Sequence, residues 1–182
     1  MNKYLTILIL LITSSCCKDS IEIARYYLTE NEKEFIPYTE NQKIKYKYSN
    51  GFDFYMNVID VKTEFKRTKT EHCGENYVSF ESKTAYLQSD IPDFNISISI
   101  KPKEYCTDIG IMINNSYLQK DVSVKADFDT LIIDNNKYFN VYQFENHIID
   151  TTIINPYKVL YNKTDGIIQI IMTDDEKFTI SK

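Results

Sequence analysis

Apolar and polar residues alternate with a period of two through much of the chain. In the clearest case, residues 94–100, one phenylalanine and three isoleucines alternate with one asparagine and two serines. Residues 43–48 and 109–113 repeat the pattern, and Val122 and Val124 repeat it briefly. Because successive side chains of a strand point to opposite faces, this alternation predicts strands with one buried and one solvent-facing side.

Turn sequences connect these segments into predicted hairpins. They lie at residues 49–51, 134–137 and 163–166, and in the last of them Asp165 and Gly166 supply the positive φ that such turns require. The strands that flank or follow the turns are predicted at residues 52–64, 131–133, 138–144, 157–161, 167–172 and 178–181. Short strands at regular spacing are typical of antiparallel β architecture.

One helix is predicted near the start of this β region. Thr29 and Glu32 have the spacing of a capping box, in which each side chain accepts a hydrogen bond from the backbone of the other residue. Pro37 ends the segment, and residues 21–28 are a weaker candidate for a second helix. The predicted fold is therefore mainly β, an antiparallel sandwich or partly open barrel of about 8–10 strands with one or two short N-terminal helices.

The N-terminus has the three-part pattern of a secretory leader. A short basic start with Lys3 precedes an apolar run over residues 4–12, and three small residues lead to Cys16. This end resembles a bacterial lipobox, in which the cysteine becomes the new N-terminus and carries acyl chains such as palmitate. The alternative is a plain signal peptide cut nearby, with Cys16 or Cys17 in a disulfide.

The leader divides the chain into three expected parts. They are a lipoprotein signal peptide over residues 1–15, a lipidated N-terminus and tether over 16–28, and a single β-rich domain over 29–182. The expected location is the cell envelope, with the domain held to a membrane by lipid on Cys16. Lys18 and Asp19 partly resemble an export signal to the outer face of the outer membrane, which leaves surface-facing and periplasm-facing orientations open.

Two further stretches carry a resemblance to a family. Residues 28–38, followed by a strand and the turn at 49–51, and residues 159–168, which lead to a C-terminal strand, are similar to small, largely uncharacterised lipoproteins of Bacteroidota. Such proteins commonly place a hairpin with a tyrosine, polar residues, a glycine and two aliphatic residues near the C-terminus. The resemblance implies an address and a fold, and it brings no established activity.

Composition and charge exclude two classes of partner. The net charge is −5 with no basic stripe, so the sequence predicts no binding to nucleic acid. The four glycines lie far apart, whereas a phosphate-binding loop needs clustered glycines, so no nucleotide cofactor is expected. The 15 tyrosines and 10 phenylalanines favour strands and a well-filled core.

Cys73 and Cys106 are predicted to form a disulfide. An oxidising envelope favours this bond, and two unpaired thiols are the alternative. A zinc site that also uses His72 and His147 is disfavoured, because neighbouring residues of a strand point to opposite faces. A pairing of either cysteine with His147 for nucleophilic catalysis has no supporting motif.

Three classes of function follow, and the sequence alone does not name a ligand. The leading hypothesis is a non-catalytic envelope lipoprotein whose β domain binds a protein or a small apolar or glycan ligand. The second is a lipocalin-like or unclosed barrel that carries lipid or a small apolar ligand. The third is an envelope enzyme. No cofactor, metal or catalytic residue is predicted.

Overall fold

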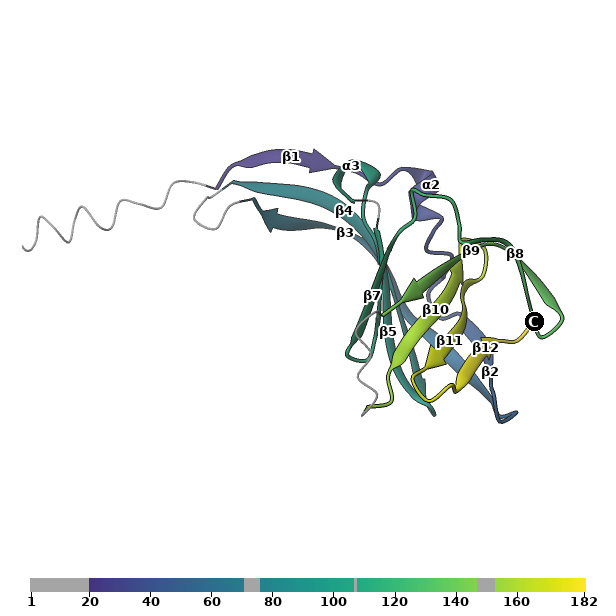
Figure 1. The fold of residues 1–182 in the computed structure, drawn as a ribbon. Coiled ribbons are helices and arrows are strands. Elements are labelled where there is room, and N and C mark those ends of the chain that lie inside the picture. Colours follow the sequence, from purple (N-terminus) through teal and green to yellow (C-terminus); the bar gives the residue numbers. More distant parts are fainter. Residues whose placement is uncertain (1–19, 71–75, 107, 147–152) are drawn as a thin grey trace, which may run out of the picture.

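A computed structural model describes residues 20–70, 76–106, 108–146 and 153–182 of the chain. Within them the fold is mainly β, as predicted, with twelve strands and two short helices (Figure 1). The elements are β1 (Glu22–Tyr26), α2 (Glu30–Lys33), β2 (Lys43–Tyr48), β3 (Asp53–Lys69), β4 (Tyr77–Asp90), β5 (Asp93–Ile100), α3 (Lys103–Cys106), β6 (Asp108–Ile113), β7 (Ser116–Asp121), β8 (Phe128–Ile133), β9 (Asn136–Glu145), β10 (Pro156–Asn162), β11 (Gly166–Met172) and β12 (Lys177–Ile180).

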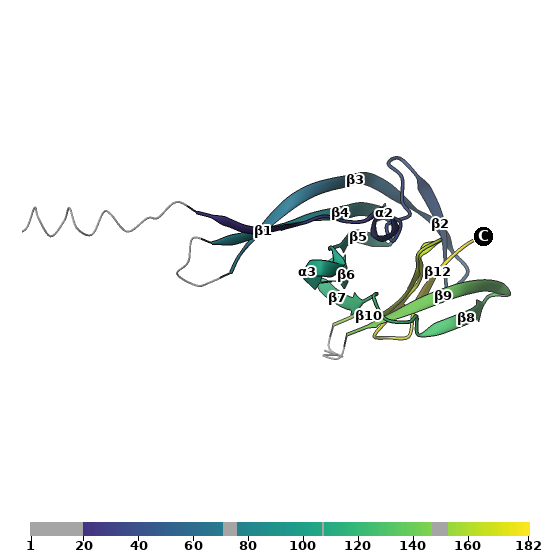
Figure 2. The same ribbon diagram turned by 90° about the horizontal axis from the view of Figure 1, so that it is seen from above.

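Eleven of the strands form one strongly curved antiparallel sheet. Their order is β7-β6-β5-β4-β3-β2-β12-β11-β10-β9-β8, so the C-terminal half of the chain continues the N-terminal half through the β2–β12 pair. The sheet curls until β7 packs beside β9, and it does not close into a barrel (Figure 2). The prediction of a sandwich or partly open barrel is confirmed, with more strands than expected.

Two strands extend beyond the rest of the sheet. The distal parts of β3 and β4 project away from the other strands, and β1 pairs with β4 in parallel along this projection (Figures 1 and 2). We call β1, residues 64–69 of β3 and residues 77–82 of β4 the arm. The remaining curved sheet is called the barrel for short, although it is not closed. The arm is a three-stranded sheet that starts where the first described residues begin.

Aromatic and aliphatic side chains fill the concave side of the barrel. Phe178 lies 4.9 Å from Phe94 and 5.8 Å from Phe54 between ring centroids, and all three are buried. Isoleucines of β5 and β6, such as Ile98 and Ile111, have no exposed surface. This packing favours a solid core over the ligand-filled interior of a lipid carrier. A smaller cluster packs the β8–β9 hairpin against β10 and β11.

Three buried tyrosines bond to backbone groups, and two of them hold the start of β11. The Tyr46 hydroxyl donates to the Ile167 carbonyl at 2.7 Å, and the Ile167 N–H donates to the Tyr38 hydroxyl at 2.7 Å. The Tyr161 hydroxyl donates to the Phe35 carbonyl. Burial raises the pKa of all three phenols well above 10. Gly166, with φ +75°, lets the Tyr38 ring lie directly on the backbone, since an added Cβ would come 2.1 Å from the Tyr38 oxygen.

The local predictions near the N-terminus had mixed outcomes. The capping box is confirmed: Thr29 Oγ1 accepts from the Glu32 N–H at 3.2 Å, and Glu32 Oε2 accepts from the Thr29 N–H at 2.7 Å. The second helix predicted at residues 21–28 is wrong. Residues 22–26 form β1 instead, because the edge of β4 that β5 leaves unpaired accepts a parallel strand.

The brief alternation at Val122 and Val124 also does not form a strand. β7 ends at Asp121, and the Asp121 carboxylate accepts the Ser123 N–H at 2.8 Å, which turns the chain. Val122 is buried in the core and Val124 is exposed.

Candidate functional site

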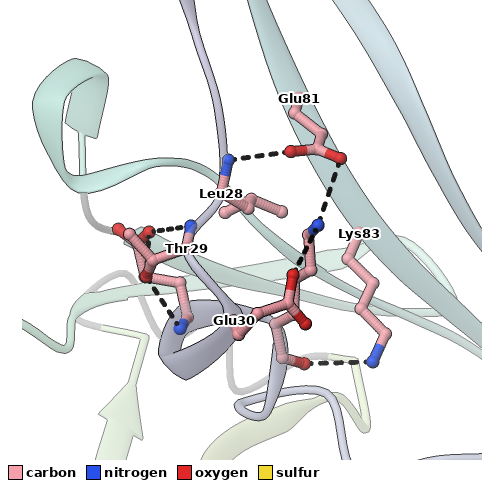
Figure 3. Close-up of polar contacts among 7 residues, drawn as sticks. Leu28, Thr29, Glu30, Glu81 and Lys83 are labelled. Carbon is pink, nitrogen blue, oxygen red and sulfur yellow. Dashed lines mark hydrogen bonds and ion pairs between the residues drawn. The ribbon is translucent and has the colours of Figure 1, made fainter.

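A polar junction joins the arm to the barrel where the chain leaves β1. Glu81 of β4 accepts a hydrogen bond from the Leu28 N–H at 2.9 Å (Figure 3). It also forms an ion pair with the Lys33 ammonium at 3.5 Å. Lys33 also pairs with Glu30 at 3.1 Å, within the single turn of α2. These contacts hold the segment between β1 and α2 against β4.

Lys83 completes this junction from the next position on the same face of β4. Its ammonium donates to the carbonyl oxygens of Lys33, the last residue of α2, and of Ile36, each at 3.0 Å, and so satisfies backbone acceptors at the end of the helix. Desolvation by burial lowers the pKa of Lys83. Because its charge is already used by two carbonyl acceptors, we assign Lys83 a structural role.

A second group of polar residues surrounds a cavity on the side of the barrel that lies away from the arm. The cavity has a volume of about 590 Å³ and lies over β2, β11 and β12, beside the turn between β8 and β9. We call it the lysine cavity. Its lining residues are Lys47, Tyr48, Ser49, Asp134, Asn135, Asn136, Gln169, Lys177, Thr179, Ile180, Ser181 and Lys182.

The sheet register builds the floor of the lysine cavity. Thr179 pairs with Gln169 on one side and with Lys47 on the other, so the three side chains form one row across β11, β12 and β2. Gln169 and Thr179 are buried, and the Gln169 amide donates to the Thr179 hydroxyl at 2.8 Å. This bond leaves the Thr179 hydroxyl hydrogen and the Gln169 carbonyl oxygen for other partners.

The rim of the lysine cavity comes from the β8–β9 turn. Asp134 and Asn135 have φ values of 48° and 63°, the left-handed pair that a two-residue hairpin turn requires. Aspartate and asparagine tolerate this conformation better than most residues, so the local sequence favours the tight turn. The turn places an amide and a carboxylate opposite the strand residues of the floor.

The lysine cavity is locally basic although the chain as a whole is acidic. Lys47, Lys177 and Lys182 line it, against Asp134 as the acidic side chain. Lys182 pairs with Asp165 at 2.9 Å, whereas Lys47 and Lys177 have no ion-pair partner within the described part of the chain. Two ammonium groups with free donors beside amide and hydroxyl groups can bind a carboxylate, a phosphate or a sugar hydroxyl.

None of the residues that the sequence singled out is among the described residues that line this cavity. Cys16 and Cys73 lie outside the described residues, as do His72 and His147. Cys106 is the last residue of α3, and its side chain is not described, so the disulfide with Cys73 stays a prediction. The lipidation of Cys16 stays a prediction as well.

Two further properties of the described residues bear on a metal site and on membrane-spanning helices. In this part of the chain, no three or more histidine, cysteine, aspartate or glutamate side chains gather closely enough to hold a metal ion. The described helices also include none long and apolar enough to cross a bilayer.

Sequence reasoning missed the lysine cavity because its floor is assembled from distant segments. Lys47 and Thr179 meet only because β12 closes onto β2, and no local pattern indicates that pairing. The turn at residues 134–137 was predicted, yet its position over β11 and β12 depends on how the sheet curls. Comparison with protein-family models, with curated proteins and with solved structures found no match to this chain.

Proposed function

We propose that this chain is a lipid-anchored protein of the bacterial cell envelope whose β domain binds an anionic glycan or another small acidic ligand in the lysine cavity. The anchor part rests on the leader and on Cys16, which stands four residues before the first described residue. The binding part rests on the geometry of the cavity.

The ligand class rests on two ammonium groups that lie over a polar floor and have no ion-pair partner among the residues that the structure describes. A volume of about 590 Å³ suits a ligand of a few sugar units or a small organic acid. Lys47 and Lys177 supply charge, and Gln169 and Thr179 supply hydrogen bonds that depend on direction. Most of the lining residues have polar side chains, which favours an acidic or hydroxylated ligand over an apolar one.

An intact-mass measurement tests the anchor. The protein is extracted from membranes of a bacterium that processes lipoproteins, and its mass is taken before and after reduction. We expect a chain that starts at Cys16 with acyl mass added, and a gain of two hydrogens on reduction for the disulfide between Cys73 and Cys106. A chain that retains residues 1–15, or one without acyl mass, contradicts the anchor. Protease treatment of intact cells then separates the surface-facing from the periplasm-facing orientation.

A titration tests the ligand class. Tri-galacturonic acid is added to the purified protein and binding is measured by calorimetry, with the neutral galactose trimer as the comparison. We expect the acidic trimer to bind more tightly, because each charge-assisted hydrogen bond contributes about 1.5–3 kcal/mol. Replacing Lys47 and Lys177 by glutamine should remove most of that preference.

The matched control replaces lysines that are also exposed and do not adjoin the lysine cavity. Lys43 of β2 and Lys69 of β3 do not line it, and their replacement by glutamine makes the same change in net charge. Equal loss of binding in both double variants indicates a general charge effect and contradicts the site.

A further inference from the structure

One face of the arm carries aromatic and basic side chains together. Arg25 and Arg67 both pair with Ser79 of β4, one from each side, so all three point to the same face. Phe65 lies two residues before Arg67 and Lys69 two residues after it, which places them on that face too. We call Arg25, Tyr27, Phe65, Arg67, Lys69 and Tyr77 the arm face.

Ring contacts organise the arm face. Tyr27 meets Phe65 edge to face with ring centroids 5.3 Å apart, and the Arg25 guanidinium lies 5.2 Å from the centre of the Phe65 ring. Nearer the tip, the Arg67 guanidinium lies 4.9 Å from the centre of the Tyr77 ring. The arm face is therefore an ordered surface and not a set of separate side chains.

The opposite face of the arm is covered. Tyr105 of α3 stacks on Phe80 with centroids 4.5 Å apart and also approaches Tyr26 at 5.9 Å. Phe80 and Tyr26 pair with each other and point away from the arm face. α3 thus provides this side of the arm with a partner within the chain.

The arm face and the adjoining edge remain largely exposed. Tyr27 is 59% exposed and Phe65 46%, and at the start of the arm Ile21 and Ile23 are 61% and 54% exposed. Large apolar side chains gathered at one end of a molecule indicate an interaction surface.

The charge of the arm face limits what that partner can be. Arg67 and Lys69 have no ion pair with any described residue, while Arg25 is held by Glu22 at 2.7 Å. Exposed aromatic rings beside arginine and lysine are the combination found where proteins meet anionic lipid headgroups.

The short connection between Cys16 and the arm limits the distance from the tip of the arm to the membrane. The Tyr77 N–H donates to the Ile21 carbonyl at 3.0 Å, which attaches Ile21 to the tip of the arm. Cys16 is five residues earlier in the chain, and five residues span at most about 18 Å when fully extended. Acyl chains on Cys16 would therefore hold the tip within that distance of the headgroups.

We propose that the arm face lies against an anionic lipid surface, as a second membrane contact beside the acyl chains. The inference rests on the proposed anchor at Cys16. The contact places aromatic rings at headgroup level and the ammonium and guanidinium groups near lipid phosphates. It orients the barrel relative to the membrane, which the acyl chains alone would leave free to rotate.

The test uses the absence of tryptophan from the chain. Phe65→Trp places a single fluorophore on the arm face, and Phe52→Trp places one at a similarly exposed aromatic position just before β3, about 40 Å away along the strand path. The lipidated protein is reconstituted into vesicles of phosphatidylethanolamine and phosphatidylglycerol with brominated acyl chains. We expect quenching and a blue shift for F65W and neither for F52W. Absence of quenching in F65W, or equal quenching in both, overturns the proposal.

Charge variants in the F65W chain test the lipid specificity. Replacing Arg67 and Lys69 by glutamine should weaken the contact about 25-fold, because each basic residue near an anionic surface contributes about a factor of five. The same replacement of Lys43 and Lys137, which lie outside the arm, should leave quenching unchanged. Vesicles of phosphatidylcholine alone should give weak quenching, and undiminished quenching there contradicts an anionic surface.

The failure of this inference can be told from the failure of the anchor. Acyl mass on Cys16 together with an unquenched F65W contradicts only the arm contact. A chain without acyl mass contradicts the anchor, and the arm contact is then contradicted with it.

Discussion

The arm and the barrel are parts of the same sheet, but they are stabilised in different ways. In the barrel, aromatic rings such as Phe178 are buried on all sides, and buried tyrosine hydroxyls pair with backbone groups. In the arm, Phe65 remains 46% exposed, and Arg25 and Glu22 form an ion pair at the surface. The side chains of the barrel therefore determine stability, whereas those of the arm are exposed and can contact another molecule or surface.

Truncating one phenylalanine in each region gives the largest expected contrast. Phe178→Ala removes a buried ring with three aromatic neighbours and should lower the free energy of unfolding by about 3–5 kcal/mol. Phe65→Ala removes a half-exposed ring and should cost less than about 1 kcal/mol. Urea denaturation of both variants measures the difference, and similar losses would show that the arm is part of the core.

Two glycines with positive φ allow a finer comparison within the barrel. Gly166→Ala should cost more than about 3 kcal/mol, because a methyl group adds overlap with the Tyr38 ring to the strain of φ +75°. Gly51→Ala carries a similar strain at φ +94° but has no atom within 4 Å, so it should cost only about 1–2 kcal/mol. Thermal unfolding of the two variants ranks them, and equal costs would mean that the Tyr38 ring moves aside.

Alkaline pH should unfold the barrel through its tyrosines. The pKa values of Tyr38, Tyr46 and Tyr161 are raised above 10 by burial, so the unfolded chain releases these protons first. Stability should be unaffected below about pH 10 and fall steeply above it. Phenolate absorbance followed together with circular dichroism measures this, and Tyr46→Phe should make the fall less steep. Ionisation of all the tyrosines before unfolding contradicts the buried arrangement.

Acid should loosen the arm with a smaller effect. Hydrogen bonds from Arg25 lower the pKa of Glu22 to about 2, from 4.5. The folded pKa lies below the unfolded one, so the contribution of Glu22 is complete above about pH 4.5 and is lost as the pH falls toward 2. Amide exchange of β1 in the parent chain and in Glu22→Gln should differ at neutral pH and converge in acid. A difference that persists at pH 2 would mean that the carboxylate charge is not what matters.

Local signals in the sequence predicted the hairpins and the capped helix. The turn at residues 163–166 and the capping box of Thr29 and Glu32 each depend on residues close together in the chain, and both are present. β4 was missed because Ser79, Ser82 and Thr84 are buried, which hides the alternation of apolar and polar residues. A strand at the centre of a curved sheet can bury small polar side chains on both faces.

The long-range features were beyond local reasoning for a different reason. The parallel pairing of β1 with β4 depends on an edge that exists only after β5 turns away. The lysine cavity likewise depends on β12 meeting β2, which brings Thr179 beside Lys47. Local sequence patterns predict the strands. Which of their outward-facing side chains come together in a site depends on the curvature of the folded sheet.

The parallel pairing of β1 with β4 has a mechanical consequence. β1 starts near the tip of the arm and runs toward the barrel, and backbone hydrogen bonds to β4 lie across its length. A pull on the chain ahead of residue 20 therefore acts along the strand, so these bonds share the load and must break together instead of one after another. Force that reaches the molecule through its N-terminus is spread over the arm before it reaches the barrel.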